Sequence, residues 1–235
     1  MFFFPYRVDL SLNHIPLLTI LLSIICIFIY GNQVSSEELL HTNTLDFCTH
    51  VENKNFDESI KLISGNNSTN NCANVLLSIH RAQNKSEHIN KIVKTANNTD
   101  NTIDIEQIRN ALVNEYSAFT NTTPLTLTSR IQYSPSTYHV LNMISASFAH
   151  GNIYHLIGNL IFFYAFAASI EIIVGWKKYL FSVLTLCIGT NLSYSISTIH
   201  DSNALPTIGL SGVVMGMIGL FAFLMPTVRI KCILF

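Results

Sequence analysis

Residues 152–174 read NIYHLIGNLIFFYAFAASIEIIV, an apolar run whose one charged side chain is Glu171. Two similar runs follow it. A helix needs about 20 apolar residues to cross a bilayer, and each run, with its flanks, is long enough. Another such run lies within residues 1–34. The sequence therefore predicts an all-α, polytopic membrane helix bundle, with helices after the first at about 150–174, 179–199 and 208–225.

The composition is uneven along the chain. Of the 235 residues, 49% are hydrophobic and 11% are charged, whereas roughly a quarter of the residues in a soluble domain are charged. Residues 35–136 are rich in Asn, Thr, Ser and charged side chains, and their apolar spacing is typical of helices. We therefore expect a first transmembrane helix in residues 1–34, a polar helical insert at 35–136 and a membrane core at 137–235.

The first apolar run has a second interpretation, which is a cleaved signal peptide. Residues 15–30, IPLLTILLSIICIFIY, carry no charge, and no small-x-small cleavage site follows Tyr30. The preceding segment is long for a signal peptide and only weakly basic, because Asp9 offsets Arg7. These features favour a retained helix, and the signal peptide stays as the alternative.

Basic residues predict the orientation of the spans. Lys177 and Lys178 follow the second expected span, Arg229 and Lys231 follow the fourth, and Arg7 precedes the first. Loops rich in Lys and Arg usually stay in the cytoplasm. The N-terminus is therefore expected in the cytoplasm and the insert outside. No organelle-targeting region precedes the first span, which favours a bacterial inner membrane.

Neither metal nor nucleic acid is expected as a partner. The net charge is −1, with no basic stripe to neutralise phosphates. The five cysteines show no CxxC spacing, and no H-E-x-x-H motif accompanies the histidines. Cys48 and Cys72 both lie in the insert and could pair in an oxidising compartment, which the sequence leaves open.

Polar residues at the expected outer end of the 150–174 helix are candidates for function. His155 and Asn159 are four residues apart and share one helix face, with His150 nearby. Such groups are costly in hydrocarbon unless they face a partner or water. One interpretation is hydrogen bonding that holds helices together; the other is a catalytic site.

Gly209-Leu210-Ser211-Gly212 opens the last apolar run. Close helix packing by small residues is the simpler interpretation of this stretch. A serine nucleophile would need a base, preoriented donors for the anionic intermediate, and water. At a helix start on the outer face, Ser211 would have free backbone N–H groups, and His155 and Asn159 would lie at the same depth. This agreement favours acyl-transfer chemistry.

The run His150-x4-His155-x3-Asn159, followed by Gly209-x-Ser211-Gly212, resembles the signature of the rhomboid family of intramembrane serine proteases. Glu171-x3-Gly175 resembles it as well. The resemblance implies a six-span core, four spans of which are present here, with Ser211 as the nucleophile. It further implies oxyanion stabilisation by His155 and Asn159, a site that His150 and Gly209 adjoin, and structural roles for Glu171 and Gly175.

The resemblance has one gap. The family's general base is a histidine on the sixth helix, and none of the nine histidines here follows Ser211. We interpret the chain as C-terminally truncated, with a further helix starting at 228–235, and as inactive in this form.

The expected function is that of an intramembrane serine endopeptidase. Its partners would be the lipid bilayer and transmembrane protein substrates, and no cofactor is implied. The alternative is a rhomboid-like pseudoprotease that binds membrane clients without cleavage. A transporter or channel subunit would predict an inverted repeat, and none is visible in the sequence.

Overall fold

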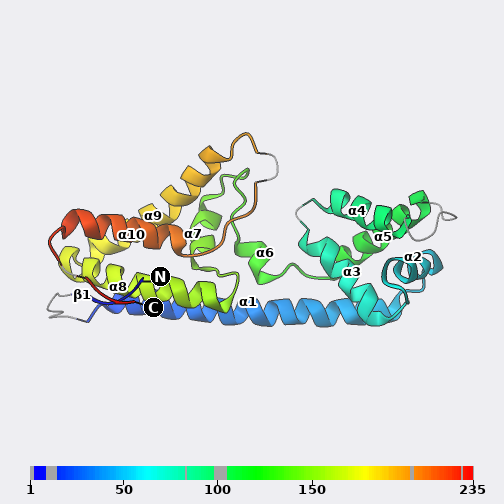
Figure 1. Cartoon of the computed structure of the whole chain (residues 1–235), viewed down its shortest axis with the longest axis horizontal. Helices are drawn as coiled ribbons and strands as arrows, with labels where there is room; N and C mark the ends of the chain where they lie inside the picture. The colour runs from blue at the N-terminus through cyan, green and yellow to red at the C-terminus, as the bar shows by residue number, and fades with distance from the viewer. Residues whose placement is uncertain are drawn as a thin grey trace. The chain divides into compact units, whose positions relative to one another are not determined.

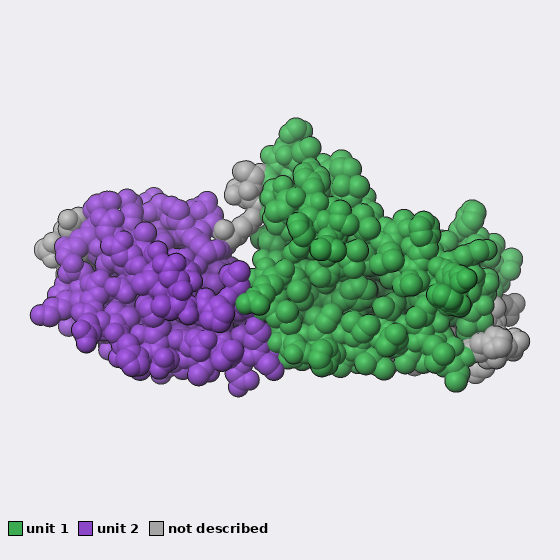
Figure 2. Space-filling view, turned by 180° about the vertical axis from the view of Figure 1, so that it is seen from behind, with its two compact units in different colours: residues 1–34, 127–235 green, residues 35–126 purple. Residues whose placement is uncertain are grey.

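The computed structural model describes residues 3–8, 15–82, 84–97, 105–201, 204–228 and 230–234. The chain forms two compact units, coloured separately in Figure 2. Unit 1 comprises Met1–Val34 and Leu127–Phe235, and unit 2 comprises Ser35–Thr126. The helix α1 (Leu17–His50) contributes to both units (Figure 1).

Unit 1 is an all-α membrane bundle, apart from one short pair of strands. Its remaining helices are α6 (Leu127–Ile131), α7 (Val140–Phe148), α8 (Ile153–Val174), α9 (Trp176–Ser197) and α10 (Ser211–Leu224). Helix α10 packs against both α8 and α9. The core draws on four helices through buried apolar side chains, among them Leu22, Phe163, Val183 and Met217.

Length and apolarity make three of the described helices candidate membrane spans, namely α1, α8 and α9. The fourth apolar helix, α10, has 14 residues and extends about 21 Å, whereas a bilayer core is about 30 Å thick. The predicted run at 208–225 is thus helical but shorter than expected, because α10 begins only at Ser211.

The expected helix start at 228–235 is not observed. Ile230–Leu234 instead forms strand β2, which pairs antiparallel with β1 (Phe3–Val8), and Phe3 lies opposite Leu234. A short run rich in isoleucine fits a strand as well as a helix, and its pairing partner lies at the other end of the sequence. Arg229, used above to predict orientation, lies outside the described residues.

Two further features of unit 1 were not expected. Helix α7 precedes α8, and unit 1 resumes at Leu127 rather than at 137. The polar segment before α7 joins unit 1 because Tyr133 is fully buried: its hydroxyl contacts Ser195 Oγ at 2.5 Å, and its backbone bridges to Thr207.

Unit 2 combines the second part of α1 with further helices around its own apolar core. They are α2 (Lys54–Ser64), α3 (Thr69–Arg81), α4 (Lys85–Asn97) and α5 (Ile105–Thr122). The Asn53 side chain accepts hydrogen bonds from the first turn of α2, and Gly65 ends that helix with a φ of 82°. Fully buried Phe56, Leu76 and Phe119 lie in the core.

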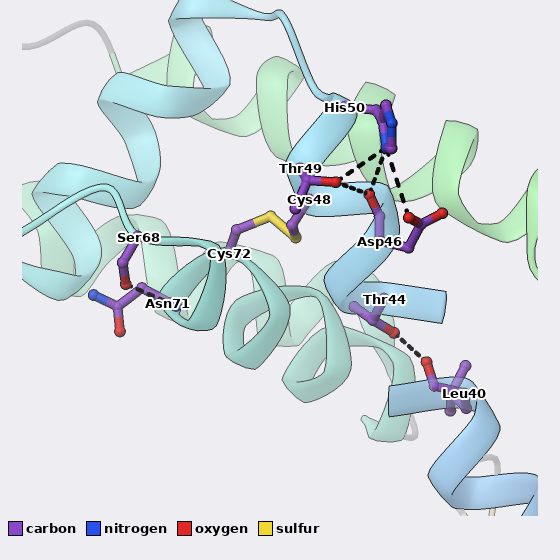
Figure 3. The surroundings of a disulfide bond; sticks show 9 residues. All are labelled: Leu40, Thr44, Asp46, Cys48, Thr49, His50, Ser68, Asn71 and Cys72. Carbon is purple, nitrogen blue, oxygen red and sulfur yellow. Dashed lines mark hydrogen bonds and ion pairs between the residues drawn. A yellow bond between two sulfur atoms is a disulfide. The ribbon is translucent and has the colours of Figure 1, made fainter. Parts of the chain in front are cut away.

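A disulfide joins α1 to α3 within unit 2. Cys48 and Cys72 are bonded, with their Cα atoms 6.0 Å apart (Figure 3). The pairing that the sequence left open therefore occurs. Because it closes a loop between residues 24 apart in sequence, it restricts the unfolded chain and stabilises this unit.

Candidate active site

Helix α8 places His155 and Asn159 on one face near its N-terminus. The helix begins after Asn152, whose side-chain oxygen accepts a hydrogen bond from the backbone N–H of His155 at 2.8 Å. An asparagine in this position satisfies one of the free N–H groups of the first turn. The cap fixes where α8 starts and therefore the height at which the His155 ring leaves the helix.

Gly209 brings the chain to Ser211 in a conformation that suits glycine. Its φ is 124°, and its backbone N–H donates to Ala146 O at 2.8 Å. A Cβ atom at this position would lie 2.6 Å from Cε1 of His155. Both the positive φ and the ring contact exclude a larger side chain. The glycine thus allows the backbone before α10 to approach the imidazole closely.

Ser211, the first residue of α10, contacts both α8 side chains. Its Oγ lies 2.9 Å from Nε2 of His155 and donates a hydrogen bond to Oδ1 of Asn159 at 3.1 Å. A hydroxyl has only one proton to donate. Nε2 of His155 donates to Oγ in the tautomer that carries a proton on this nitrogen, and accepts from Oγ in the other tautomer. With the Ser211 proton donated to Oδ1 of Asn159, the first tautomer applies and His155 is a hydrogen-bond donor to the serine.

Unpaired polar atoms gather beside this serine. Within the described residues, four buried side-chain nitrogens have no partner in hydrogen-bonding geometry, and three belong to His150 and Asn159. His150 is 2% exposed and Asn159 is 8% exposed. The His150 ring packs edge-on against His155, with centroids 5.4 Å apart. Buried polar groups are nearly always paired, so such a concentration is typical of a site that binds something.

His150 differs from its expected position. The sequence suggested a helix from about 150, whereas α8 begins at Ile153 and His150 lies in the link between α7 and α8. The Asn152 cap excludes the preceding residues from the helix. The link nevertheless directs the His150 ring to His155.

Glu171 and Gly175 lie at the other end of α8, away from Ser211. The Glu171 carboxylate accepts from Leu18 N at 2.9 Å and from both Thr19 N and Thr19 Oγ1 at 2.8 Å. These groups form the first turn of α1, and Tyr179 OH lies 2.9 Å from Thr19 Oγ1. Gly175, with a φ of 78°, separates α8 from α9 and donates to Glu171 O. We call the set Glu171, Leu18, Thr19 and Tyr179 the Glu171 cluster.

Sequence reasoning missed two residues near the serine. Asn152 could have been found as an N-cap residue directly before an apolar run. Gln33 could not: its Oε1 accepts from His150 N at 3.0 Å, and these residues lie 117 positions apart. Nothing in a single sequence connects positions so distant.

The arrangement is suited to acyl transfer at Ser211, which is exposed. Ser211 stands at a helix N-terminus beside two side chains that carry N–H groups: His155, whose Nε2 contacts Oγ, and Asn159, whose Oδ1 accepts from Oγ. Such donors stabilise an oxyanion when they are fixed before reaction. Among the described residues, no three His, Cys, Asp or Glu side chains are close enough to hold a metal ion.

Comparison with known proteins identifies the second part of the chain. Residues 137–235 match the family model of the Rhomboid domain. Neither the curated proteins nor the solved structures compared with this chain gave a match. All the residues around Ser211 discussed above, except Gln33, fall within the matched region.

Proposed function

Because residues 137–235 of this integral membrane protein form a rhomboid domain, we propose that it is an intramembrane serine endopeptidase. It would cleave peptide bonds in or next to the transmembrane segments of other membrane proteins. The contact of Ser211 Oγ with His155 Nε2 at 2.9 Å carries the proposal, together with the unpaired donor of Asn159. If Ser211 served only to pack helices together, neither the unpaired amide of Asn159 nor the contact between Ser211 and the His155 imidazole would be needed.

The proposed reaction proceeds through an acyl-enzyme. Ser211 Oγ attacks the scissile carbonyl carbon and loses its proton to a general base, which then protonates the leaving amine as the C–N bond breaks. Water hydrolyses the resulting ester and restores the hydroxyl. His155 Nε2–H, Asn159 Nδ2–H and the backbone N–H of Ser211 would hold the oxyanion in both steps.

The general base is assigned to the sixth-helix histidine that the family resemblance implies. His155 Nε2 lies 2.9 Å from Ser211 Oγ, and we assign His155 the tautomer that donates from this nitrogen. The oxyanion role suits that tautomer. The proposal therefore gives the role of general base to an imidazole other than that of His155.

The orientation belongs to the same proposal, with the N-terminus in the cytoplasm and Ser211 near the opposite face of a bacterial inner membrane. Lys177 and Lys178 stand at the start of α9, beside the Glu171 end of α8. The Cys48–Cys72 disulfide supports an exterior position for unit 2, because disulfides persist in oxidising compartments.

Cleavage by the full-length protein tests the proposal. In liposomes with a labelled transmembrane substrate, Ser211→Ala should lower the cleavage rate by at least about 10³-fold, since the nucleophile is lost. Ser182→Ala makes the same change in a partly buried serine of α9, whose hydroxyl donates to Lys178 O, and should leave the rate unaltered. Cleavage by Ser211→Ala at the wild-type rate would remove Ser211 from the mechanism. A wild-type protein that retains such substrates without product would instead be a non-cleaving binding protein.

A further inference from the structure

Gln33 is a buried amide where the chain leaves and re-enters unit 1. It stands one residue before the boundary at Val34, and its side chain is 3% exposed. Its Nε2 donates to Thr128 Oγ1 at 3.1 Å, and Thr128 is the second residue after unit 1 resumes at Leu127. The Gln33 side chain therefore joins the two segments of unit 1 at the point where the first ends and the second begins.

The other half of the same amide reaches the Ser211 site. Oε1 of Gln33 accepts from the backbone N–H of His150 at 3.0 Å. The His150 link ends at Asn152, which caps α8 and accepts from His155 N–H. The three residues His150–Asn152 thus connect the Gln33 contact directly to α8, which carries His155.

We propose that Gln33 is a positioning residue for the Ser211 site, holding the His150–Asn152 link so that His155 meets Ser211. This inference rests on the proposed function. Without the amide, the buried N–H of His150 loses its acceptor, and the link must move to find another. Small displacements of catalytic groups lower rates strongly, since an oxyanion donor acts only over a narrow range of distance.

Gln33→Met tests this role, because methionine has a similar volume and no hydrogen-bonding amide. In the full-length protein, kcat per active molecule should fall about tenfold with little change in KM. Active molecules are counted by titrating Ser211 with a fluorophosphonate, so that a loss of folded protein is not mistaken for slower chemistry. Asn32→Met is the matched control, since Asn32 is the exposed neighbour of Gln33, and should react as wild type.

Thr128→Val removes one partner of the amide and leaves the His150 contact in place. It should lower kcat per active molecule about threefold, because the Gln33 side chain is then held at one end only. This variant decides the question if Gln33→Met gives no titratable protein. A wild-type kcat for Thr128→Val would then overturn the proposal.

The remaining outcomes separate this inference from the function on which it rests. A wild-type kcat for Gln33→Met per titrated site, with Ser211→Ala inactive, would overturn the positioning role alone. A loss of rate explained wholly by fewer titratable sites would make Gln33 a structural residue. Cleavage by Ser211→Ala would overturn the proposed function itself.

Discussion

At the C-terminal end of α8, the carboxylate of Glu171 accepts three hydrogen bonds from the first turn of α1. At the N-terminal end of the same helix and in the link just before it, Asn159 and His150 bury three polar atoms with no partner in hydrogen-bonding geometry among the described residues. Glu171 and Thr19 at one end, and His150 and Asn159 at the other, are all buried. A saturated polar cluster and an unsaturated one therefore lie at opposite ends of α8.

The contrast separates two uses of polar residues in a membrane. A saturated cluster joins helices and contributes to stability, since each buried donor and acceptor finds its partner. An unsaturated cluster lowers stability and persists where binding or chemistry requires it. Substitutions at the Glu171 end of α8 should accordingly change mainly stability, and substitutions at the His155 end should change mainly kcat.

The largest effect is expected from His155→Ala at the unsaturated end. Loss of an oxyanion donor should lower kcat by about 10²–10³-fold, whereas the thermal midpoint should change little because the ring is only partly buried. His139→Ala is the matched control, since His139 is exposed and its side chain makes no capping bond. A wild-type kcat for His155→Ala would place the oxyanion donors elsewhere.

A smaller effect, on stability instead of rate, is expected from Glu171→Ala. Three hydrogen bonds to a buried carboxylate are lost, so the free energy of unfolding should fall by about 2–3 kcal/mol. Glu171→Gln keeps an accepting oxygen and should lose less. Denaturation in mixed micelles measures the change, and kcat per titrated site should stay at the wild-type value. A reduced kcat with unchanged stability would contradict the division between the ends.

The smallest effect is an expected gain of stability in Asn159→Leu. Leucine has the same branched arrangement of four side-chain heavy atoms and removes the unpaired Nδ2, so the free energy of unfolding should rise by about 1 kcal/mol while cleavage slows. The same denaturation assay measures it. A loss of stability would instead favour the interpretation in which Asn159 holds helices together.

Much of the bundle follows from local sequence. Apolar runs predicted α8 and α9 because a membrane helix satisfies its own backbone and needs only sufficient apolar length. The spacing of His155 and Asn159 placed them on one face, since that periodicity is a property of the helix itself. Gly209 and Ser211 stood out for the same local reason.

What sequence reasoning missed depends on partners distant in the chain. Strand β2 exists because Ile230–Leu234 meets Phe3–Val8, and Gln33 matters because it meets Thr128 and His150. The start of α8 was predicted too early, because Asn152 caps the helix and leaves His150 in the link before it. Contacts between residues so far apart in sequence form only when the protein folds, and a single sequence shows no local pattern that predicts them.

The Glu171 cluster has a consequence for how the protein is made. Glu171 follows Leu18, whose amide it accepts, by 153 positions, and all of unit 2 lies between them. At roughly 5–20 residues per second, a ribosome needs roughly 8–30 s to synthesise that interval. During this time the nascent α1 has no carboxylate at its first turn, so water or lipid headgroups must solvate those amides. Assembly of the membrane bundle therefore includes a contact between one of the first segments synthesised and a much later one.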